Sequence, residues 1–266
     1  MTPSIRVVVF HFVDRSRTIR LPGGKRAPRR LDTVVRYPEI GSPYPLVVFG
    51  HGFALTPDTY AALLSFWAAA GYVVAAPAFP LGNANAPGGP SENDLVNQPR
   101  DMSFVITQLL ADDARASGVL HGKFDPARIA VAGHSDGAVT ALAVAYDRRF
   151  RDPRVGAAVI LSGATLGGMG AFPRRGPPLL AAQGTADPIN PPSATADYFA
   201  QARRPKFLLW LRGASHLPPY TTDQPYLRVV EGVTTAFLDH YLGGGPLGAI
   251  AATARPATLA RLVADP

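Results

Sequence analysis

Cysteine is absent from the 266-residue sequence. Disulfide bonds, a thiolate nucleophile and a cysteine-ligated zinc site are therefore excluded. The sequence also lacks the run of roughly 20 apolar residues that a membrane-spanning helix needs, so we expect no membrane span. The first residues, Met1 to Arg6, show no apolar stretch followed by a cleavage site. We therefore expect either a cytoplasmic protein or a secreted protein whose leader has been removed.

Acidic residues are in the minority, because 26 lysine and arginine residues stand against 19 aspartate and glutamate residues, for a net charge of +7. Much of the excess lies between Arg6 and Arg36, around the turn sequence Pro22-Gly23-Gly24. A basic segment of this kind can bind nucleic acid. Around this turn, however, no stacking aromatic residues are interleaved with the arginines. We interpret the segment as a solvated face and expect no nucleic-acid partner.

Short apolar runs alternate with helical patterns through the middle of the chain. This alternation predicts an α/β fold with a mostly parallel central sheet and helices on both faces. Strand-like composition at 5–13 and 31–37 predicts an antiparallel N-terminal edge, with an exposed loop over 15–30. The predicted core strands are 46–49, 72–76, 128–132, 155–161, 179–183 and 207–211, and the predicted helices are 58–70, 99–113, 136–146, 193–202 and 227–241.

No linker or internal repeat divides the chain, so residues 1–266 are predicted to form a single domain without a separate cap domain. Residues 81–98 are rich in glycine, asparagine and proline and form the longest irregular stretch. Such a stretch in a compact domain is usually functional, so we expect an active-site loop there. Residues 247–266 are alanine-rich and are expected to pack as a last helix or to fray.

The motif that carries chemistry is Gly133-His134-Ser135-Asp136-Gly137, between a predicted strand and a predicted helix. A serine hydroxyl becomes a useful nucleophile only when a base removes its proton, and a rigid turn must expose it. Glycine on both sides lets the strand and the helix approach closely. The helix N-terminus behind Ser135 also adds partial positive charge where an oxyanion would form.

Two further strand ends carry the partners that such a serine needs. Asp187 follows the predicted strand 179–183, and His216 follows the predicted strand 207–211. Because parallel strands place their carboxyl ends along one edge of the sheet, the three side chains are expected to lie together. Asp187 could instead cap the turn before Pro188. The end of the preceding strand, the obvious rival position for an acid, holds Ser162.

These features resemble those of α/β-hydrolase-fold carboxylesterases over nearly the full length of the chain. The chain is similar to the branch that holds platelet-activating-factor acetylhydrolases, chlorophyllase-like esterases and cutinase-like polyester hydrolases. The matching stretches are Thr33-Val34-Val35-Arg36-Tyr37-Pro38, Phe49-Gly50-His51-Gly52-Phe53, Gly133-His134-Ser135-Asp136-Gly137, Gly184-Thr185-Ala186-Asp187 and Gly213-Ala214-Ser215-His216.

The resemblance implies a role for each residue of the motifs. Ser135 attacks the ester carbonyl, His216 moves the proton and Asp187 orients the imidazole, which is also the division of labour that the chemistry requires. The backbone N–H groups of Phe53 and Asp136 are expected to form the oxyanion hole. His51 is expected to support that turn, His134 to occupy the variable position of the motif, and no metal ion or organic cofactor is expected.

The predicted activity is hydrolysis of carboxylic esters through an acyl-enzyme. No long insertion separates Leu161 from Leu179, where many lipases of this fold place a helical cap, so we expect an open site. Phe53 and Phe79 are expected to contact substrate, beside Tyr60 and Trp67, and polyesters are possible substrates alongside small esters. A serine peptidase or amidase, a thioesterase and a non-catalytic binding protein remain alternatives, and the oligomeric state stays open.

Asp136 departs from the resemblance, because related esterases often carry a neutral or bulky residue after the nucleophile. A negative charge in the first turn of a helix is favourable by about 0.3–1 kcal/mol. The same charge near a developing oxyanion is unfavourable. The sequence therefore predicts that Asp136 stabilises the helix slightly while opposing turnover.

Overall fold

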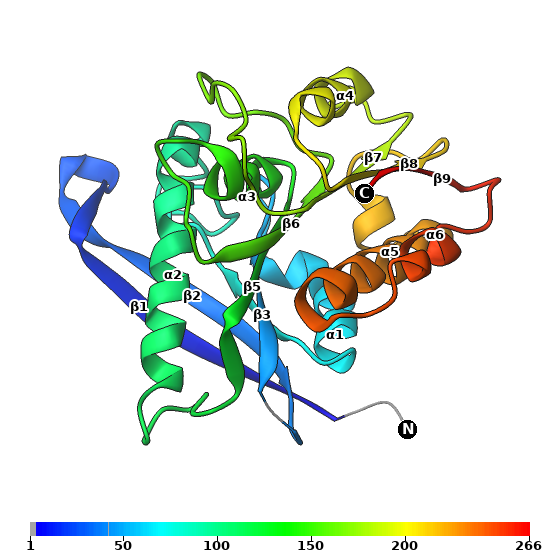
Figure 1. Cartoon of the computed structure of the whole chain (residues 1–266). Coiled ribbons are helices and arrows are strands. Elements are labelled where there is room, and N and C mark those ends of the chain that lie inside the picture. Colours follow the sequence, from blue (N-terminus) through cyan, green and yellow to red (C-terminus); the bar gives the residue numbers. More distant parts are fainter. Residues whose placement is uncertain (1–3, 42) are drawn as a thin grey trace.

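The computed structural model describes residues 4–41 and 43–266, which form a nine-stranded sheet with helices on both faces (Figure 1). The strand order is β1-β2-β4-β3-β5-β6-β7-β8-β9, and the run from β4 to β8 is parallel throughout. The prediction of a mostly parallel sheet with an antiparallel N-terminal edge is confirmed. The strands are β1 Ile5–Arg20, β2 Arg26–Pro38, β3 Tyr44–Gly50, β4 Val73–Pro77, β5 Phe124–His134, β6 Val155–Leu161, β7 Leu179–Gly184, β8 Lys206–Leu211 and β9 Ala260–Asp265.

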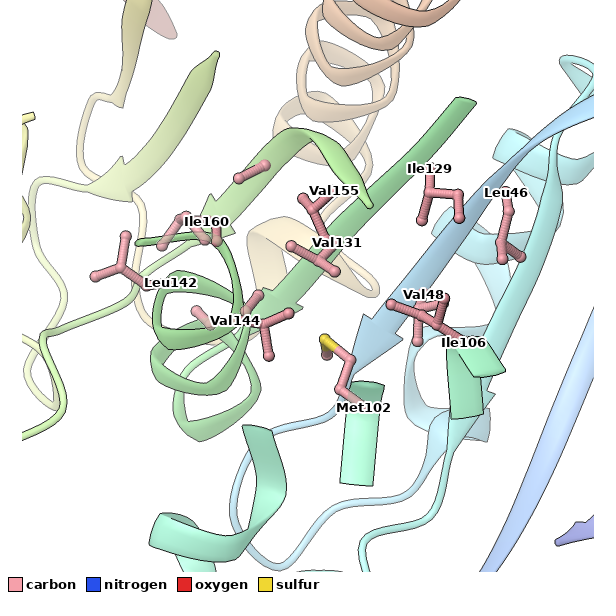
Figure 2. Close-up of a cluster of buried hydrophobic side chains, with 14 of the residues drawn as sticks. Leu46, Val48, Met102, Ile106, Ile129, Val131, Leu142, Val144, Val155 and Ile160 are labelled. Carbon is pink, nitrogen blue, oxygen red and sulfur yellow. The ribbon is translucent and has the colours of Figure 1, made fainter. Parts of the chain in front are cut away.

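The helices pack on the two faces of the sheet because alternate strand residues point to opposite sides. In β3, Leu46 and Val48 face one core, and Val47 and Phe49 face the other. Figure 2 shows the first core, where strand side chains meet Met102 and neighbours from two helices. The helices are α1 Ala61–Ala69, α2 Gln98–Asp113, α3 Asp136–Tyr146, α4 Pro192–Gln201, α5 Gln224–Gly243 and α6 Gly248–Thr253; α2, α3 and α4 cover the first core, and α1, α5 and α6 cover the second.

The N-terminal edge differs from its prediction. Instead of an exposed loop over 15–30, β1 and β2 continue as one long hairpin to Arg20 and Arg26, with a tight turn at Pro22–Gly24 (Figure 1). The guanidinium of Arg29 is 2% exposed and donates to Asp94 at 2.9 Å and to Asp101 at 2.8 Å. Buried charge requires such pairing. Part of the basic segment is therefore buried and ion-paired. The interpretation of this segment as a solvated face is wrong for Arg29.

The C-terminal segment forms both a helix and a strand. The short helix α6 packs against α5, and β9 then pairs antiparallel with β8 from Lys206 to Leu211. The expectation of a last helix or a frayed end was therefore incomplete, because the tail completes the far edge of the sheet. Among the described residues, no helix has the length and apolar character to cross a membrane.

Candidate active site

The turn between β5 and α3 holds Ser135 in a strained conformation. Its φ of 56° and ψ of −122° lie where residues with a side chain are rarely found. A Cβ on Gly133 would lie 2.1 Å from the carbonyl oxygen of Gly137, and a Cβ on Gly137 would lie 2.0 Å from that of Gly50. Both positions therefore require glycine, and the close approach of strand and helix leaves the serine hydroxyl at the top of the turn.

The side chains of Ser135, His216 and Asp187 form one hydrogen-bonded row. His216 Nε2 lies 2.9 Å from Ser135 Oγ, and His216 Nδ1 lies 2.7 Å from Asp187 Oδ2. They follow the carboxyl ends of the parallel strands β5, β8 and β7, of which β7 and β8 are neighbours and β6 lies between β5 and β7. The arrangement can withdraw the hydroxyl proton from Ser135 while the carboxylate orients the imidazole.

Asp187 is stabilised as a carboxylate by several donors. Burial by itself raises its pKa, but hydrogen bonds from His216 and from the backbone N–H groups of Ile189 and Asn190 outweigh burial and hold the pKa below its usual range. Gln183 Nε2 donates at 3.1 Å to the same oxygen that contacts His216. The carboxylate is therefore both ionised and fixed in orientation.

The loop after β3 presents its backbone toward Ser135. His51 Nε2 accepts the N–H of Phe79 at 3.0 Å, so Nδ1 carries the ring proton and donates to the carbonyl of Gly52 at 2.8 Å. Burial lowers the pKa of His51 to about 4, in keeping with a neutral ring. Among the described residues, the N–H groups of Phe53 and Asp136 have no hydrogen-bond acceptor, and both residues line the cavity beside Ser135.

That cavity has a volume of about 250 Å³ and is lined mainly by segments that meet at the sheet edge. Phe53 lines this cavity and is partly exposed. A larger cavity of about 530 Å³ lies under the N-terminal hairpin and contains none of the three aligned side chains. The lining residues of the smaller cavity are Gly52, Phe53, Leu55, Glu92, His134, Ser135, Asp136, Ile189, Asn190, His216 and Leu217.

Phe79 does not contribute to the cavity, contrary to the prediction. Its ring is fully buried, 5.0 Å from the ring of His51, and belongs to the core on the α2 side. Tyr60 and Trp67 are also fully buried, in the opposite core. These aromatic side chains pack in the cores beneath the site and do not face the cavity. The prediction failed because an aromatic residue next to a strand end can pack inward as readily as it can face a ligand.

The carboxyl group of Asp136 lies in an unfavourable environment. Burial and the nearby Glu92 raise its pKa to about 6. Within the part of the chain that the structure describes, its Oδ2 is buried and has no hydrogen-bond partner. Among the described residues that line the cavity, Glu92 and Asp136 are the acidic side chains, and none is a lysine or an arginine.

Comparison with known proteins gives the family of the chain. Residues 18–186 match the profile of the chlorophyllase family. The chain belongs to that family. This confirms the chlorophyllase-like part of the resemblance and the prediction of a carboxylic-ester hydrolase. The matched residues include Ser135 and end one residue before Asp187.

The fold of this chlorophyllase-family chain is similar to that of a ferulic acid esterase from Streptomyces cinnamoneus. The TM-score is 0.72, with 22% sequence identity over 97% of this chain and 94% of the esterase. The likeness confirms an α/β-hydrolase fold. The search of curated proteins gave no match.

Several lining residues of the chlorophyllase-family site were missed from the sequence. Glu92 lies in a short 3₁₀ helix, Glu92–Asn97, within the predicted active-site loop, and Asn190 follows the predicted acid by three residues. Neither belongs to a motif, so proximity in sequence to Asp187 and to the loop was the only available signal. Among the residues described, no cluster of three or more histidine, aspartate or glutamate side chains could hold a metal ion.

Proposed function

We propose that this ester hydrolase works by covalent catalysis with Ser135 as nucleophile, His216 as base and Asp187 as the orienting acid. The observation that carries the proposal is the unbroken row from Ser135 Oγ through both ring nitrogens of His216 to Asp187 Oδ2. The three side chains follow strands of one sheet, which supports treating residues 1–266 as a single catalytic domain.

The reaction begins when His216 takes the proton of Ser135 as the oxygen attacks the ester carbonyl. The N–H groups of Phe53 and Asp136 donate to the oxyanion of the tetrahedral intermediate. His216 then gives the proton to the leaving alcohol, and an acyl group remains on Ser135. Water activated by the same imidazole releases the acid, and Asp187 stays ionised throughout.

The size and the openness of the cavity indicate the substrates. A volume of about 250 Å³ suits the acyl part of a small aliphatic or aromatic ester. Residues 162–178, all of which the structure describes, contain no helix that could cover Ser135. An uncovered serine can also meet an ester bond within a polymer, so we extend the proposal to polyesters as a secondary substrate class.

The proposal is tested by assaying p-nitrophenyl esters of increasing acyl length and labelling with a fluorophosphonate. We expect turnover that is highest for short acyl groups, and a mass shift on the peptide that contains Ser135. Ser135→Ala should lower turnover by several decades with little change in melting temperature, because the hydroxyl contributes little to packing. Retention of more than a few per cent of the activity would remove Ser135 from the mechanism.

The same panel separates the rival activities. Matched amide and thioester substrates would identify a peptidase, an amidase or a thioesterase by a higher kcat/KM than that of the oxygen ester. Binding of an ester without turnover and without labelling would indicate a non-catalytic protein. Release of soluble acid from a polyester film measures the secondary substrate class directly.

A further inference from the structure

A chain of buried hydrogen bonds connects the loop after β3 with the loop after β8. The backbone N–H of Gly52 lies 3.1 Å from the hydroxyl of Tyr60, which lies 2.7 Å from Nδ1 of His134. Nε2 of His134 lies 2.9 Å from the backbone carbonyl oxygen of His216. Tyr60 and His134 are fully buried, so water does not compete for these bonds.

The chemistry of the groups fixes the direction of every bond in this chain. A carbonyl oxygen can only accept, so Nε2 of His134 must carry the ring proton and donate to His216. Nδ1 then accepts, and the hydroxyl of Tyr60 donates to it. That hydroxyl in turn accepts from the N–H of Gly52, which can only donate. Burial and the neighbouring His216 lower the pKa of His134 to about 3, so the ring holds the single proton that this assignment needs.

Both ends of the chain adjoin groups that the proposed mechanism uses. Gly52 precedes Phe53, and its carbonyl is already held by His51, so both backbone groups of Gly52 are fixed by side chains. The other end holds the backbone of His216 itself. The ring of His134 also lies 4.6 Å from the ring of His216, centroid to centroid. His134 therefore lies between the expected oxyanion donor and the base, and it directly precedes Ser135 in the sequence.

We propose that Tyr60 and His134 are positioning residues that hold the Phe53 N–H and the His216 imidazole at fixed positions relative to Ser135. The inference rests on the proposed function, since it assigns no role apart from ester hydrolysis. Neither side chain touches the reacting atoms. Their effect is on geometry, and a displacement of about 1 Å in a catalytic group can reduce the rate roughly a hundredfold.

Tyr220 provides a matched control for the loss of a buried hydroxyl. It is fully buried like Tyr60, and its hydroxyl has two partners, Ser162 Oγ at 2.9 Å and the carbonyl of Ala182 at 3.2 Å. These partners lie at the ends of β6 and β7, and neither is Gly52 or His216. Tyr220→Phe therefore removes a comparable pair of hydrogen bonds without cutting the chain.

The experiment compares Tyr60→Phe with Tyr220→Phe on p-nitrophenyl acetate. We expect both variants to lose a similar few degrees of melting temperature. Tyr60→Phe should lower kcat by about 10- to 100-fold with KM within about twofold, whereas Tyr220→Phe should retain kcat within about twofold. The rate of fluorophosphonate labelling should fall in parallel with kcat, because labelling also requires the base and the oxyanion donors.

A second variant tests the same chain of hydrogen bonds at His134. His134→Phe removes both hydrogen bonds but keeps an aromatic ring against His216. Because the two residues act through one chain, the double variant should lose little more kcat than the worse single variant. Equal kcat in Tyr60→Phe and Tyr220→Phe would overturn the positioning role while leaving ester hydrolysis intact. A wild-type protein without turnover or labelling would overturn the proposed function, and this inference with it.

Discussion

Asp187 is buried and Asp136 is half-buried, and both lie near the same serine, yet the surroundings of their carboxyl groups are opposite. Asp187 accepts hydrogen bonds from a ring nitrogen, two backbone N–H groups and an amide, and its pKa is lowered. Asp136 has no such donors at its buried Oδ2 among the described residues, and burial together with the carboxylate of Glu92 raises its pKa to about 6. Burial acts in the same direction on both groups, so the donors decide the outcome.

This difference indicates that Asp187 acts through its negatively charged side chain, whereas Asp136 acts through its backbone N–H. The donors around Asp187 hold a negative charge beside His216, where the proposed mechanism forms a protonated imidazole. The carboxyl of Asp136 has no such donors, and the part of Asp136 that faces the expected oxyanion is its N–H. We therefore expect the two side chains to respond very differently to the same substitution.

The largest effect is expected from Asp187→Asn. Loss of the carboxylate leaves the imidazole without its orienting partner and should lower kcat by roughly 10⁴-fold, as in other enzymes with this arrangement. Asp136→Asn keeps its N–H and should stay within about tenfold of wild type. Steady-state kinetics on p-nitrophenyl acetate measures both changes.

Asp197→Asn is the control for the loss of one negative charge. Asp197 is exposed on α4 and does not line the cavity. We expect wild-type kinetics from it. If the Asp187 and Asp136 variants lost activity to the same extent, the contrast between the two carboxyl groups would be wrong.

A smaller effect is expected on the choice of substrate. Glu92 and Asp136 give the cavity a negative lining in a protein with a net charge of +7. A cationic ester should therefore be preferred over its neutral isostere. We expect kcat/KM for acetylcholine to exceed that for 3,3-dimethylbutyl acetate by about tenfold at low salt and pH 8.

Glu92→Gln should reduce that preference to about threefold, because it removes one of the two negative charges of the lining. Added salt should also reduce the preference, because Glu92 is exposed and its charge is easily screened. Asp197→Asn, with the same change in net charge, should leave the ratio unchanged. A preference that survives Glu92→Gln in full would show that the acidic lining does not select the substrate.

The sequence predicted the elements whose signals are local. The apolar runs of the parallel strands and the glycine-flanked turn at Ser135 are such signals, because each follows from a few adjacent residues. The strand-end positions of Asp187 and His216 then required only the rule that parallel strands align their carboxyl ends.

Features that depend on distant partners were missed. Arg29 is buried only because Asp94 and Asp101, more than 60 residues later, reach its guanidinium. Residues 260–265 form β9 because β8 offers a free edge, although the alanine-rich tail favours helix locally. The orientation of Phe79 could not be predicted for the same reason, since its ring packs in a core whose members come from several distant segments.

The smallest effect concerns stability, and it reverses an expectation from the sequence. The helix N-terminus favours a charged Asp136 by about 0.3–1 kcal/mol. A pKa raised to about 6 means that burial and Glu92 outweigh this benefit. Asp136→Asn should therefore raise the melting temperature at neutral pH, where the sequence alone predicted that loss of the charge would lower it.

The pH dependence gives the sign of this effect a direct test. Below about pH 4, Asp136 is protonated in both the folded and the unfolded chain. From about pH 4 until the pH has passed the folded-state pKa of about 6, the folded chain retains a proton that the unfolded chain has released, so the free energy of unfolding falls as the pH rises. Well above that pKa the loss is complete, about 1 kcal/mol after allowance for partial solvation. Asp136→Asn should thus gain about 2–4 °C over wild type at pH 7.5 and almost nothing at pH 4. An advantage that is the same at both pH values would show that ionisation of Asp136 is not its origin.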